Sequence, residues 1–338
     1  MNQVADKPLL LQAFSGENRT VPVWFMRQAG RYLPQYRAIK EKYSLNEMFR
    51  TPELAAEITC QPIDILGVDA AILFADILTL PQAMGFEITF DNTKGPLISA
   101  DLEAGTVRDF DDIPHITEII RLVRERLPAR VPLIGFAGSP FTVATYLIEG
   151  KSVINHTKTL QYMFRREQQF HQLMERLTQN TIRYAQLQFA AGAQVFQLFD
   201  TWAGILRPLD YARFVYPYVQ KIFAALELPT IYYIKNTHHL LPLVQRVSAD
   251  FISVDHSVVL GHDHVLLHSE KGVQGNLYNG LLYAEPEVLR REVNDVLMGG
   301  QRYARYIFNL SHGIFPDVDP DQLKRIVDLV HEFPWSPA

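Results

Sequence analysis

The sequence predicts a single (β/α)8 barrel, and two observations carry that prediction. Short apolar runs rich in strand-forming residues recur along the chain, and helical patterns fill the gaps between them. The runs are nearly continuous in hydrophobicity, which is typical of parallel strands buried on both faces. This alternation repeats about eight times and favours a closed parallel barrel. The runs are Val21–Met26, Asp69–Asp76, Val131–Ala137, Ala193–Asp200, Thr230–Lys235, Phe251–Asp255, Gly272–Leu277 and Tyr306–Leu310.

Helical patterns lie between these runs. Thr51, Pro52 and Glu53 open one helix with a cap residue and a proline in the first turn. Asn155–Ala191 is long enough for one extended helix or two. Further helices are predicted at Pro208–Leu226, His239–Val247, Pro286–Met298 and Pro320–Phe333.

One stretch interrupts the alternation of strands and helices. Phe86–Ser99 alternates polar with apolar residues and carries turn residues, which predicts a β-hairpin between the second strand and its helix. An open, doubly wound sheet is the alternative fold, and it is less favoured because no glycine-rich dinucleotide turn follows the first strand. There is no internal repeat, low-complexity tract or linker-like composition, so residues 1–338 are expected to form one domain.

The composition excludes several classes of protein. Apolar residues make up 48%, enough for a large core, while a net charge of −5 argues against a broad nucleic-acid surface. Cys60 is the one cysteine, so neither an intramolecular disulfide nor an ordinary cysteine-based zinc site can form. That usage fits a reducing cytoplasm. No signal peptide is evident, and no run approaches the roughly 18 apolar residues of a membrane span.

Polar and ionisable residues follow the predicted strands. In a (β/α)8 barrel the active site lies at the carboxyl ends of the strands, so these residues are expected to meet at one mouth. In chain order they are Arg27, Gln28, Arg31, Asp76, Gly138, Ser139, Tyr146, Asp200, Thr201, Lys235, Asn236, Asp255, His256, Gln274, Asn276, Ser311 and His312.

Several of these residues have an equally plain structural interpretation. Asp200, Thr201 and Asp255 can cap the following helices. Lys235 can be a Schiff-base lysine or an ion-pair partner. A lone histidine such as His312 is more often structural than catalytic.

Arg27 and Arg31 are harder to explain structurally. They flank a short segment in which Gly30 lets the backbone approach a ligand closely. Two guanidinium groups near one mouth repel each other unless an anion joins them, so an anionic substrate is expected. The alternative is pairing with local acids such as Glu41 or Asp6.

Asp76 lies between apolar residues. A buried carboxylate is costly unless it is paired or hydrogen-bonded. It can therefore accept hydrogen bonds from substrate N–H groups, hold Arg27, or form a plain structural ion pair.

At these residues the chain resembles the uroporphyrinogen decarboxylase family. Pro22–Pro34 is similar to the amino-terminal signature of that family, and Gly135–Tyr146 is similar to the second signature. The resemblance spans essentially the whole chain. Other matching segments are Phe74–Leu78, Pro81–Gly85, Phe199–Gly204, Gln274–Leu277 and Asn309–Gly313.

The resemblance implies an activity and a setting. Such enzymes convert the four acetate arms of uroporphyrinogen III to methyls, giving coproporphyrinogen III and CO2 in heme biosynthesis. They use no metal and no organic cofactor, and they are cytoplasmic or plastid homodimers. The resemblance thus implies a cofactor-independent carboxy-lyase on a TIM-type barrel.

It also implies roles for particular residues. Asp76 would lie under the macrocycle and accept hydrogen bonds from the pyrrole N–H groups, stabilising a cationic ring and not donating the proton. The proton donor is left open between Arg27 and a bound water. Arg27, Asp76 and Tyr146 are the expected catalytic residues. The expected substrate-binding residues are Arg27, Gln28, Ala29, Gly30, Arg31, Asp76, Tyr146, Phe199, Thr201 and His312.

The chain departs from the family pattern mainly in its second half. Asn236–His239 replaces a stretch that is usually glycine-rich, and His256 stands where tryptophan is usual. Tyr278–Asn279 replaces Asp-Pro, and Ser311 replaces a glycine before His312. These changes are expected to alter the rim and the substrate fit more than the reaction.

Two rival functions remain. A corrinoid-type methyltransferase would share the barrel but needs zinc held by His and Cys ligands, which Cys60 alone disfavours. A non-catalytic tetrapyrrole-binding relative is motivated by the altered rim.

Overall fold

Seven parallel strands form one curled sheet in this computed structural model, which describes residues 7–91, 95–100, 102 and 108–336. Each strand pairs with the next in the order β1-β4-β5-β6-β7-β8-β9. Their bounds are β1 Ala71–Ile72, β4 Leu133–Gly138, β5 Val195–Asp200, β6 Thr230–Ile234, β7 Phe251–Ser253, β8 Gly272–Leu277 and β9 Tyr306–Leu310.

The predicted first strand closes the barrel, but it is not a regular strand. Val23 forms one parallel bridge with Phe308 of β9, and its carbonyl accepts a 2.8 Å hydrogen bond from the Asp69 N–H ahead of β1. Side chains replace the remaining ladder bonds: the Val23 N–H donates to Asp69 Oδ2 and the Met26 N–H to Asn309 Oδ1. The prediction of a full strand at Val21–Met26 was therefore wrong in form, although the segment occupies the predicted place.

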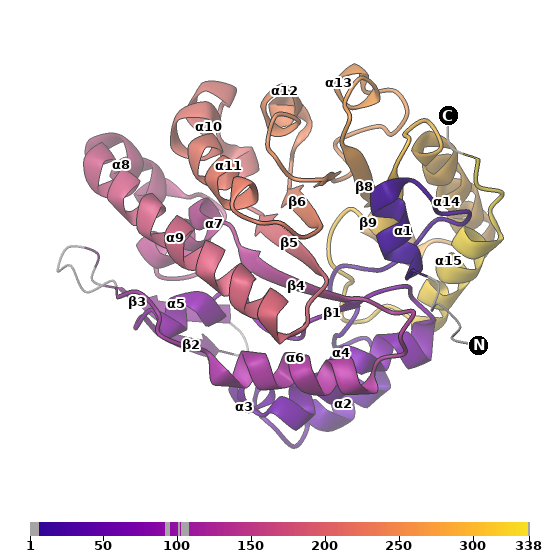
Figure 1. Cartoon of the computed structure of the whole chain (residues 1–338), viewed down its shortest axis with the longest axis horizontal. Helices are drawn as coiled ribbons and strands as arrows, with labels where there is room; N and C mark the ends of the chain where they lie inside the picture. Colours follow the sequence, from indigo (N-terminus) through magenta and orange to yellow (C-terminus); the bar gives the residue numbers. More distant parts are fainter. Residues whose placement is uncertain (1–6, 92–94, 101, 103–107, 337–338) are drawn as a thin grey trace.

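Helices surround the strands on the outside (Figure 1). The helices are α1 Leu9–Ser15, α2 Pro34–Lys40, α3 Leu45–Arg50, α4 Pro52–Leu66, α5 Thr79–Ala83, α6 Pro114–Arg126, α7 Pro140–Glu149, α8 Thr157–Arg165, α9 Glu167–Ala191, α10 Pro208–Phe214, α11 Tyr216–Ala224, α12 Leu241–Val244, α13 His264–Leu267, α14 Pro286–Gly300 and α15 Pro320–Glu332. Short 3-10 helices are η1 Ala203–Ile205, η2 His238–Leu240 and η3 Asn279–Tyr283.

The predicted hairpin is confirmed. β2 (Glu87–Asp91) and β3 (Gly95–Ser99) pair antiparallel after the short helix α5. β3 docks on the loop after α7 through an antiparallel bridge between Leu97 and Lys151. The hairpin therefore forms a wall beside the barrel mouth.

Some predicted boundaries were wrong. The predicted second strand, Asp69–Asp76, shrinks to the two residues of β1, because the chain turns away after Leu73. Pro208–Leu226 is divided at Val215, one residue before α11, whose second residue is Pro217. A proline at that position fits a new helix start, since it has no N–H to give to the preceding turn.

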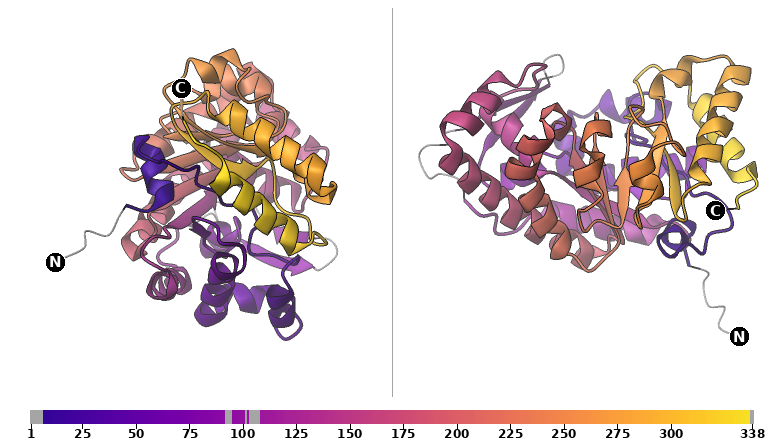
Figure 2. Two further views of the ribbon diagram at one scale, coloured as in Figure 1. Left: turned by 90° about the vertical axis from the view of Figure 1, so that its right-hand side faces the viewer. Right: turned by 90° about the horizontal axis from the view of Figure 1, so that it is seen from above.

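A separate apolar cluster fills the bottom of the barrel interior. Strand residues that point inward, among them Ile134, Val195 and Ile231, pack against Leu10 and Ala13 of α1. Helix α1 lies beside β9 and covers that end of the barrel (Figures 1 and 2).

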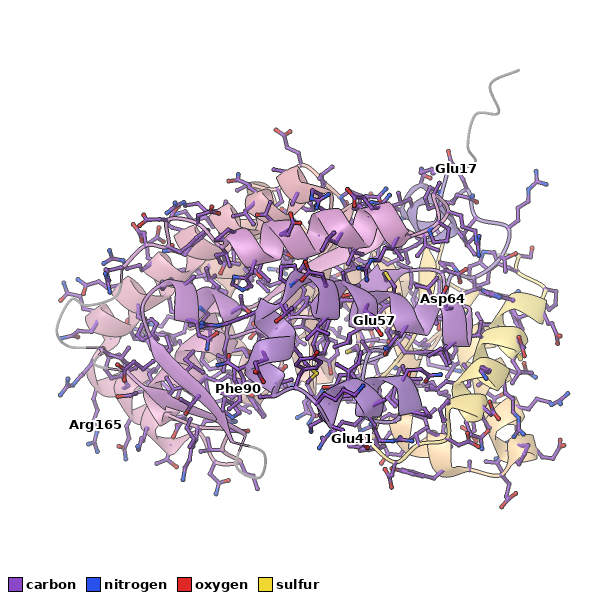
Figure 3. All side chains as sticks on the ribbon, turned by 90° about the horizontal axis from the view of Figure 1, so that it is seen from below. Glu17, Glu41, Glu57, Asp64, Phe90 and Arg165 are labelled. Atoms are coloured by element: carbon purple, nitrogen blue, oxygen red, sulfur yellow. The ribbon has the colours of Figure 1, made fainter. Side chains whose placement is uncertain are left out.

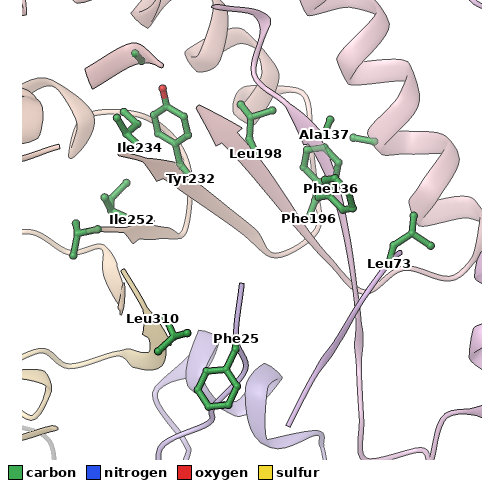
Figure 4. Packing of buried hydrophobic residues seen from close by; sticks show 14 of the residues in the cluster. Phe25, Leu73, Phe136, Ala137, Phe196, Leu198, Tyr232, Ile234, Ile252 and Leu310 are labelled. Atoms are coloured by element: carbon green, nitrogen blue, oxygen red, sulfur yellow. The ribbon is translucent and has the colours of Figure 1, made fainter. Parts of the chain in front are cut away.

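The larger apolar cluster lies between strands and helices, and Figure 4 shows part of it. Ala137, Leu198 and Ile234 on neighbouring strands belong to it. Charged residues such as Glu57 and Asp64 of α4 point outwards (Figure 3).

A polar layer lies in the barrel interior. Gln274 on β8 accepts a hydrogen bond from the Trp24 indole (3.0 Å) and donates to Gln197 (3.1 Å) and Ser253 (2.9 Å). All four side chains are buried, and the bond from Gln274 to Gln197 joins β8 to β5, which are not neighbours in the sheet. It fixes the barrel cross-section, because a buried polar group is costly without its partner.

His331 lies on the carboxyl-terminal helix α15. It ties this helix to Pro22–Met26, the closing segment that completes the barrel between β9 and β1. Its Nε2 lies 2.9 Å from Asp69 Oδ2, the same oxygen that accepts the Val23 N–H. The hydrogen bond to Asp69 raises the pKa of His331, with a smaller contribution from the nearby Asp328 charge. The folded protein thus holds the His331 proton more tightly than the unfolded chain does.

We expect His331→Gln to destabilise the fold more in acid than in base. A raised pKa gives stability that is fully present below the ordinary histidine pKa of about 6.5 and is lost as pH rises through the folded-state value. The pair is about one-third exposed on the histidine side, so the loss should be about 0.5 kcal/mol at pH ~5.5. Thermal melting across pH, with the exposed His262→Gln as control, measures it. An equal loss at acidic and basic pH would contradict the assignment.

Candidate active site

A cavity of about 520 Å³ opens at the carboxyl ends of the strands. Its size lies within the roughly 300–1,000 Å³ of small-molecule sites. An adjoining cavity of about 220 Å³ shares Arg27, Ala29, Tyr36, His312 and Gly313 with it. The larger cavity is lined by Met26, Arg27, Ala29, Tyr36, Leu45, Phe49, Ile72–Leu78, Pro96, Phe136, Tyr146, Ser152, Phe199, Thr201, Trp202, Tyr233, His312 and Gly313.

Asp76 is a half-buried carboxylate in the cavity wall. One oxygen accepts a 2.8 Å hydrogen bond from the Leu78 N–H, in a turn that directly follows β1. Burial raises the pKa of Asp76, while the Leu78 N–H and the Arg27 charge oppose the rise. No ion pair within 4.0 Å joins Asp76 to another described residue, so the plain structural ion pair has no support.

Arg27 enters the cavity wall from a left-handed backbone position, with φ of 61°. A bulky residue rarely adopts this conformation, and the cost is about 1–2 kcal/mol. The Arg27 stem packs over Gly313, where a Cβ atom would come within 2.3 Å of Arg27 Cδ. Gly313 therefore makes the room in which the Arg27 side chain lies.

Arg31 is exposed and lines the smaller cavity together with Gly30. The side chains of Arg27 and Arg31 make no hydrogen bond or ion pair with a residue that the structure describes. Glu41, one of the two acids that the sequence suggested, lies exposed on the outer surface (Figure 3). Asp6, the other, lies outside the described residues.

His312 faces the cavity as a neutral imidazole. Burial lowers its pKa to about 4, and the Arg27 and Lys235 charges act in the same direction. The Gly313 N–H donates a 2.7 Å hydrogen bond to His312 Nδ1. Because Nδ1 accepts, the ring proton is on Nε2, and the neutral ring is a hydrogen-bond donor there.

Tyr146 comes from α7 and approaches the cavity beside Trp202, whose ring centroid lies 6.2 Å away. Burial raises the pKa of Tyr146, and the Asp76 charge adds to the rise, while contacts with the Ser152 and Trp202 side chains oppose it. The hydroxyl therefore stays protonated at neutral pH and can donate a hydrogen bond.

The carboxyl end of β5 supplies Phe199 and Thr201 to the wall. Phe199 packs edge-on against Phe136 and Tyr233, with ring centroids 5.6 and 5.8 Å away. These aromatic faces give the cavity an apolar floor.

Other predicted site residues belong to the framework. Gln28 does not line the cavity: its fully buried amide accepts from the Phe25 N–H and donates to the Ala70 carbonyl, fastening the closing segment to β1. These bonds give the Gln28 side chain a structural role, and its contact with substrate stays a prediction. Lys235 is half-buried and also lies outside the lining.

Asp200 and Asp255 are buried and fully engaged. Asp200 accepts from the hydroxyls of Thr142 (2.7 Å) and Tyr232 (2.9 Å), and burial raises its pKa to about 6. It thus binds the first turn of α7, the helix that follows the neighbouring strand β4, and not the helix that follows β5. Asp255 accepts from the Asn236 N–H and from Ser257.

The departures at His256, Tyr278, Asn279 and Ser311 meet in space. The rings of His256 and Tyr278 are 4.8 Å apart, and Ser311 Oγ lies 3.3 Å from both His256 Nδ1 and Asn279 Oδ1. His256 and Tyr278 are exposed on the rim as expected, but Ser311 and Asn279 are buried behind His312. The expected change at the rim therefore holds for His256 and Tyr278, whereas Ser311 and Asn279 change the buried layer behind His312.

The sequence did not reveal most of the aromatic lining, nor Pro96. Tyr36 and Phe49 come from the segment before α4, Pro96 from the hairpin and Trp202 from the loop after β5. Tyr233 could have been found, because inward residues alternate along β6 and it follows Ile231 by two positions.

Cys60 lies half-buried on α4, in a different cavity from Asp76. Burial raises the pKa of its thiol to about 11, which disfavours the thiolate that zinc requires. Among the described residues, His, Cys, Asp and Glu side chains do not gather in a group of three or more that could hold a metal ion. In the same residues we find no helix with the length and apolarity of a membrane span.

Comparison with known structures places the fold. A methyltransferase from Methanosarcina mazei has a TM-score of 0.83 at 23% identity, over 97% of this chain and 99% of that chain. A B12-independent methionine synthase from Shewanella sp. W3-18-1 has a TM-score of 0.61 at 12% identity, over 84% of this chain and 88% of that chain. At such identities the likeness shows the shared barrel and nothing of the chemistry.

Sequence comparison is more specific. The uroporphyrinogen decarboxylase family model matches residues 5–333. Uroporphyrinogen decarboxylases from Trichlorobacter lovleyi and Thermodesulfovibrio yellowstonii are 43% and 44% identical, each over 92% of this chain and 94% of the relative. The chain, with its barrel and its cavity at the carboxyl ends of the strands, belongs to the uroporphyrinogen decarboxylase family.

Proposed function

We propose that this chain decarboxylates the four acetate arms of uroporphyrinogen III to methyls, giving coproporphyrinogen III. One observation carries the proposal: Asp76 is a half-buried carboxylate in a cavity whose other polar lining includes the donors Arg27, Tyr146 and His312. A substrate with carboxylates at its edge and N–H groups at its centre complements that arrangement.

The substrate ring can supply the electron sink. When the pyrrole is protonated beside an acetate arm, the bond to the carboxylate breaks, CO2 leaves, and the released electron pair neutralises the ring. A second proton then completes the methyl group as the ring loses its own. The protein must stabilise a cationic ring and hold the arm, and neither task needs an organic cofactor or a metal.

Asp76 would stabilise the cationic ring. Burial raises its pKa, but pyrrole N–H donors and a positive ring both favour the carboxylate form. Preorganised charge in a site with little water is worth more than in solution. We therefore keep Asp76 as the stabiliser and leave proton donation to Arg27 or a bound water.

Arg27 and Arg31 would bind substrate carboxylates, with Ala29 and Gly30 forming the wall between the two cavities. His312 and Tyr146 remain neutral donors for further carboxylates, and Thr201 adds a hydroxyl. Phe199 would pack against the ring. A neutral donor binds an arm without trapping it by charge.

The family also supports a setting for this activity. We propose a homodimer in the cytoplasm, with each chain folded as one domain and working without a cofactor. Size-exclusion chromatography with light scattering would test the dimer.

The first test is anaerobic incubation of the pure protein with uroporphyrinogen III. Stepwise loss of carboxyl groups, followed by chromatography of the oxidised products, should end at coproporphyrin without added metal or cofactor. Recovery of intact uroporphyrin from folded protein would instead favour a tetrapyrrole-binding protein without catalysis.

Asp76→Asn should lower kcat by about 10²–10³, the usual cost of removing one electrostatic stabiliser, with a smaller change in KM. The pH profile of the parent protein separates the two roles of Asp76. If the ionised form of Asp76 is the active one, kcat falls as pH drops through the Asp76 pKa. If the protonated form is the active one, kcat falls as pH rises through that pKa. We expect the first.

Gly313→Ala should lower kcat/KM by about tenfold or more, because the new methyl group displaces the Arg27 side chain. The melting temperature should change little, since the Arg27 side chain is exposed and can move aside without opening the core. In an Arg27→Gln background, adding Gly313→Ala should lower kcat/KM little further. Independent, multiplicative losses would show that Gly313 does not act through Arg27.

A further inference from the structure

The segment Ser311–Gly313 is fastened on several sides. The Ser311 N–H donates to the Leu277 carbonyl (2.7 Å), and the Tyr233 hydroxyl donates to the Ser311 carbonyl (3.0 Å). Asn279 Nδ2 donates to the Gly313 carbonyl at 3.2 Å. These bonds hold a short stretch of backbone at the cavity edge, directly after β9.

The side chains behind this segment form a chain of hydrogen bonds. His256 follows β7, Ser311 follows β9, and Asn279 begins η3 after β8. The Ser311 hydroxyl lies between the other two, 3.3 Å from His256 Nδ1 and 3.3 Å from Asn279 Oδ1. Three loops of the barrel mouth are thus joined through one hydroxyl.

The chain of hydrogen bonds through His256, Ser311 and Asn279 has a defined donor-to-acceptor direction. A hydroxyl has one proton to donate, and an amide oxygen can only accept. Ser311 must therefore donate to Asn279 Oδ1 and accept from His256, which requires the proton on His256 Nδ1. The Asn279 amide then donates onwards to the Gly313 carbonyl, so every link is satisfied in one orientation.

The chain of hydrogen bonds ends at Gly313, which contacts two groups that face the cavity. Gly313 gives its N–H to His312 Nδ1, which sets the tautomer of that ring, and its Cα lies against the Arg27 stem. A shift of the Gly313 backbone would therefore move the His312 proton donor and the Arg27 side chain together.

We propose that His256, Ser311 and Asn279 form a positioning chain that fixes His312 and Arg27 for the reaction. The proposal rests on the function proposed above, since it assigns these residues to the same site. None of the three lines the larger cavity, and only Asn279 reaches the smaller one, so their effect on the larger cavity passes through Gly313. They are positioning residues and not catalytic ones.

The test uses variants that remove one link at a time. Ser311→Ala deletes the central hydroxyl and should lower kcat about tenfold with a smaller change in KM, because small misplacements weaken transition-state contacts most. His256→Phe keeps a ring beside Tyr278 but removes the donor, and it should lower kcat about threefold, by the same argument.

A conservative variant separates positioning from packing. His256→Asn places an amide donor near the position of Nδ1, and we expect it to restore most of the activity lost in His256→Phe. His256 is exposed, so both variants should fold. Ser257→Ala is the matched control, because that neighbouring hydroxyl bonds to Asp255 and stands outside the chain.

A spectroscopic readout makes the test independent of substrate. Protein carrying ¹⁵N-labelled histidine should show His312, identified by its loss in His312→Gln, as a neutral ring protonated on Nε2. Ser311→Ala should shift this signal towards a mixture of tautomers, whereas Ser257→Ala should not.

The outcomes distinguish this inference from the proposed function. If the parent protein decarboxylates and the Ser311 and His256 variants match it, with His312 signals unchanged, the positioning chain is overturned. If the parent is inactive, the function fails, and the tautomer of His312 in Ser311→Ala still decides the inference.

Discussion

The closing segment Pro22–Met26 is the constraint on which the rest of the site depends. It lies between β9 and β1, where a barrel strand belongs, yet it makes few of the regular ladder bonds. Asp69, Asn309 and Gln28 supply side-chain partners for backbone N–H groups that lack a ladder partner, so the barrel closes without a regular strand. Because this segment ends at the left-handed Arg27, the closure of the barrel also decides where the guanidinium lies.

The interior is layered along the barrel axis. An apolar cluster capped by α1 fills the bottom, a polar network centred on Gln274 lies within the barrel, and the cavity opens at the carboxyl ends of the strands. Through the bond from Gln274 to Gln197, the polar network ties β8 to β5, which share no ladder, and this resists changes in the barrel cross-section. A rigid barrel of this kind can hold Asp76 opposite neutral and cationic donors from other strands.

The sequence was sufficient to predict the strands that are buried on both faces. β8 and β9 have the predicted bounds, because continuous apolar runs with clear ends are unambiguous. It failed at Val21–Met26 and Asp69–Asp76, where long-range side-chain contacts decide which backbone groups pair. Gln28 shows the same limit for the site. Its place in a signature does not reveal that its side-chain amide is hydrogen-bonded to the backbone of Phe25 and Ala70.

Proximity in the sequence also says little about which residues that depart from the family pattern contact one another. His256, Asn279 and Ser311 follow different strands, and only the parallel arrangement of β7, β8 and β9 brings them into one hydrogen-bond chain. Tyr36 and Phe49 from α2 and α3, and Pro96 from the hairpin, were missed for a similar reason, since those elements precede or interrupt the barrel pattern.

The most direct test of the central claim is the structure of this protein with coproporphyrinogen III, prepared without oxygen. We expect the pyrrole nitrogens to turn towards the Asp76 carboxylate at hydrogen-bond distance, about 3 Å, with propionates near Arg27 and Arg31. A macrocycle bound elsewhere, or one with Asp76 turned away from its nitrogens, would contradict it.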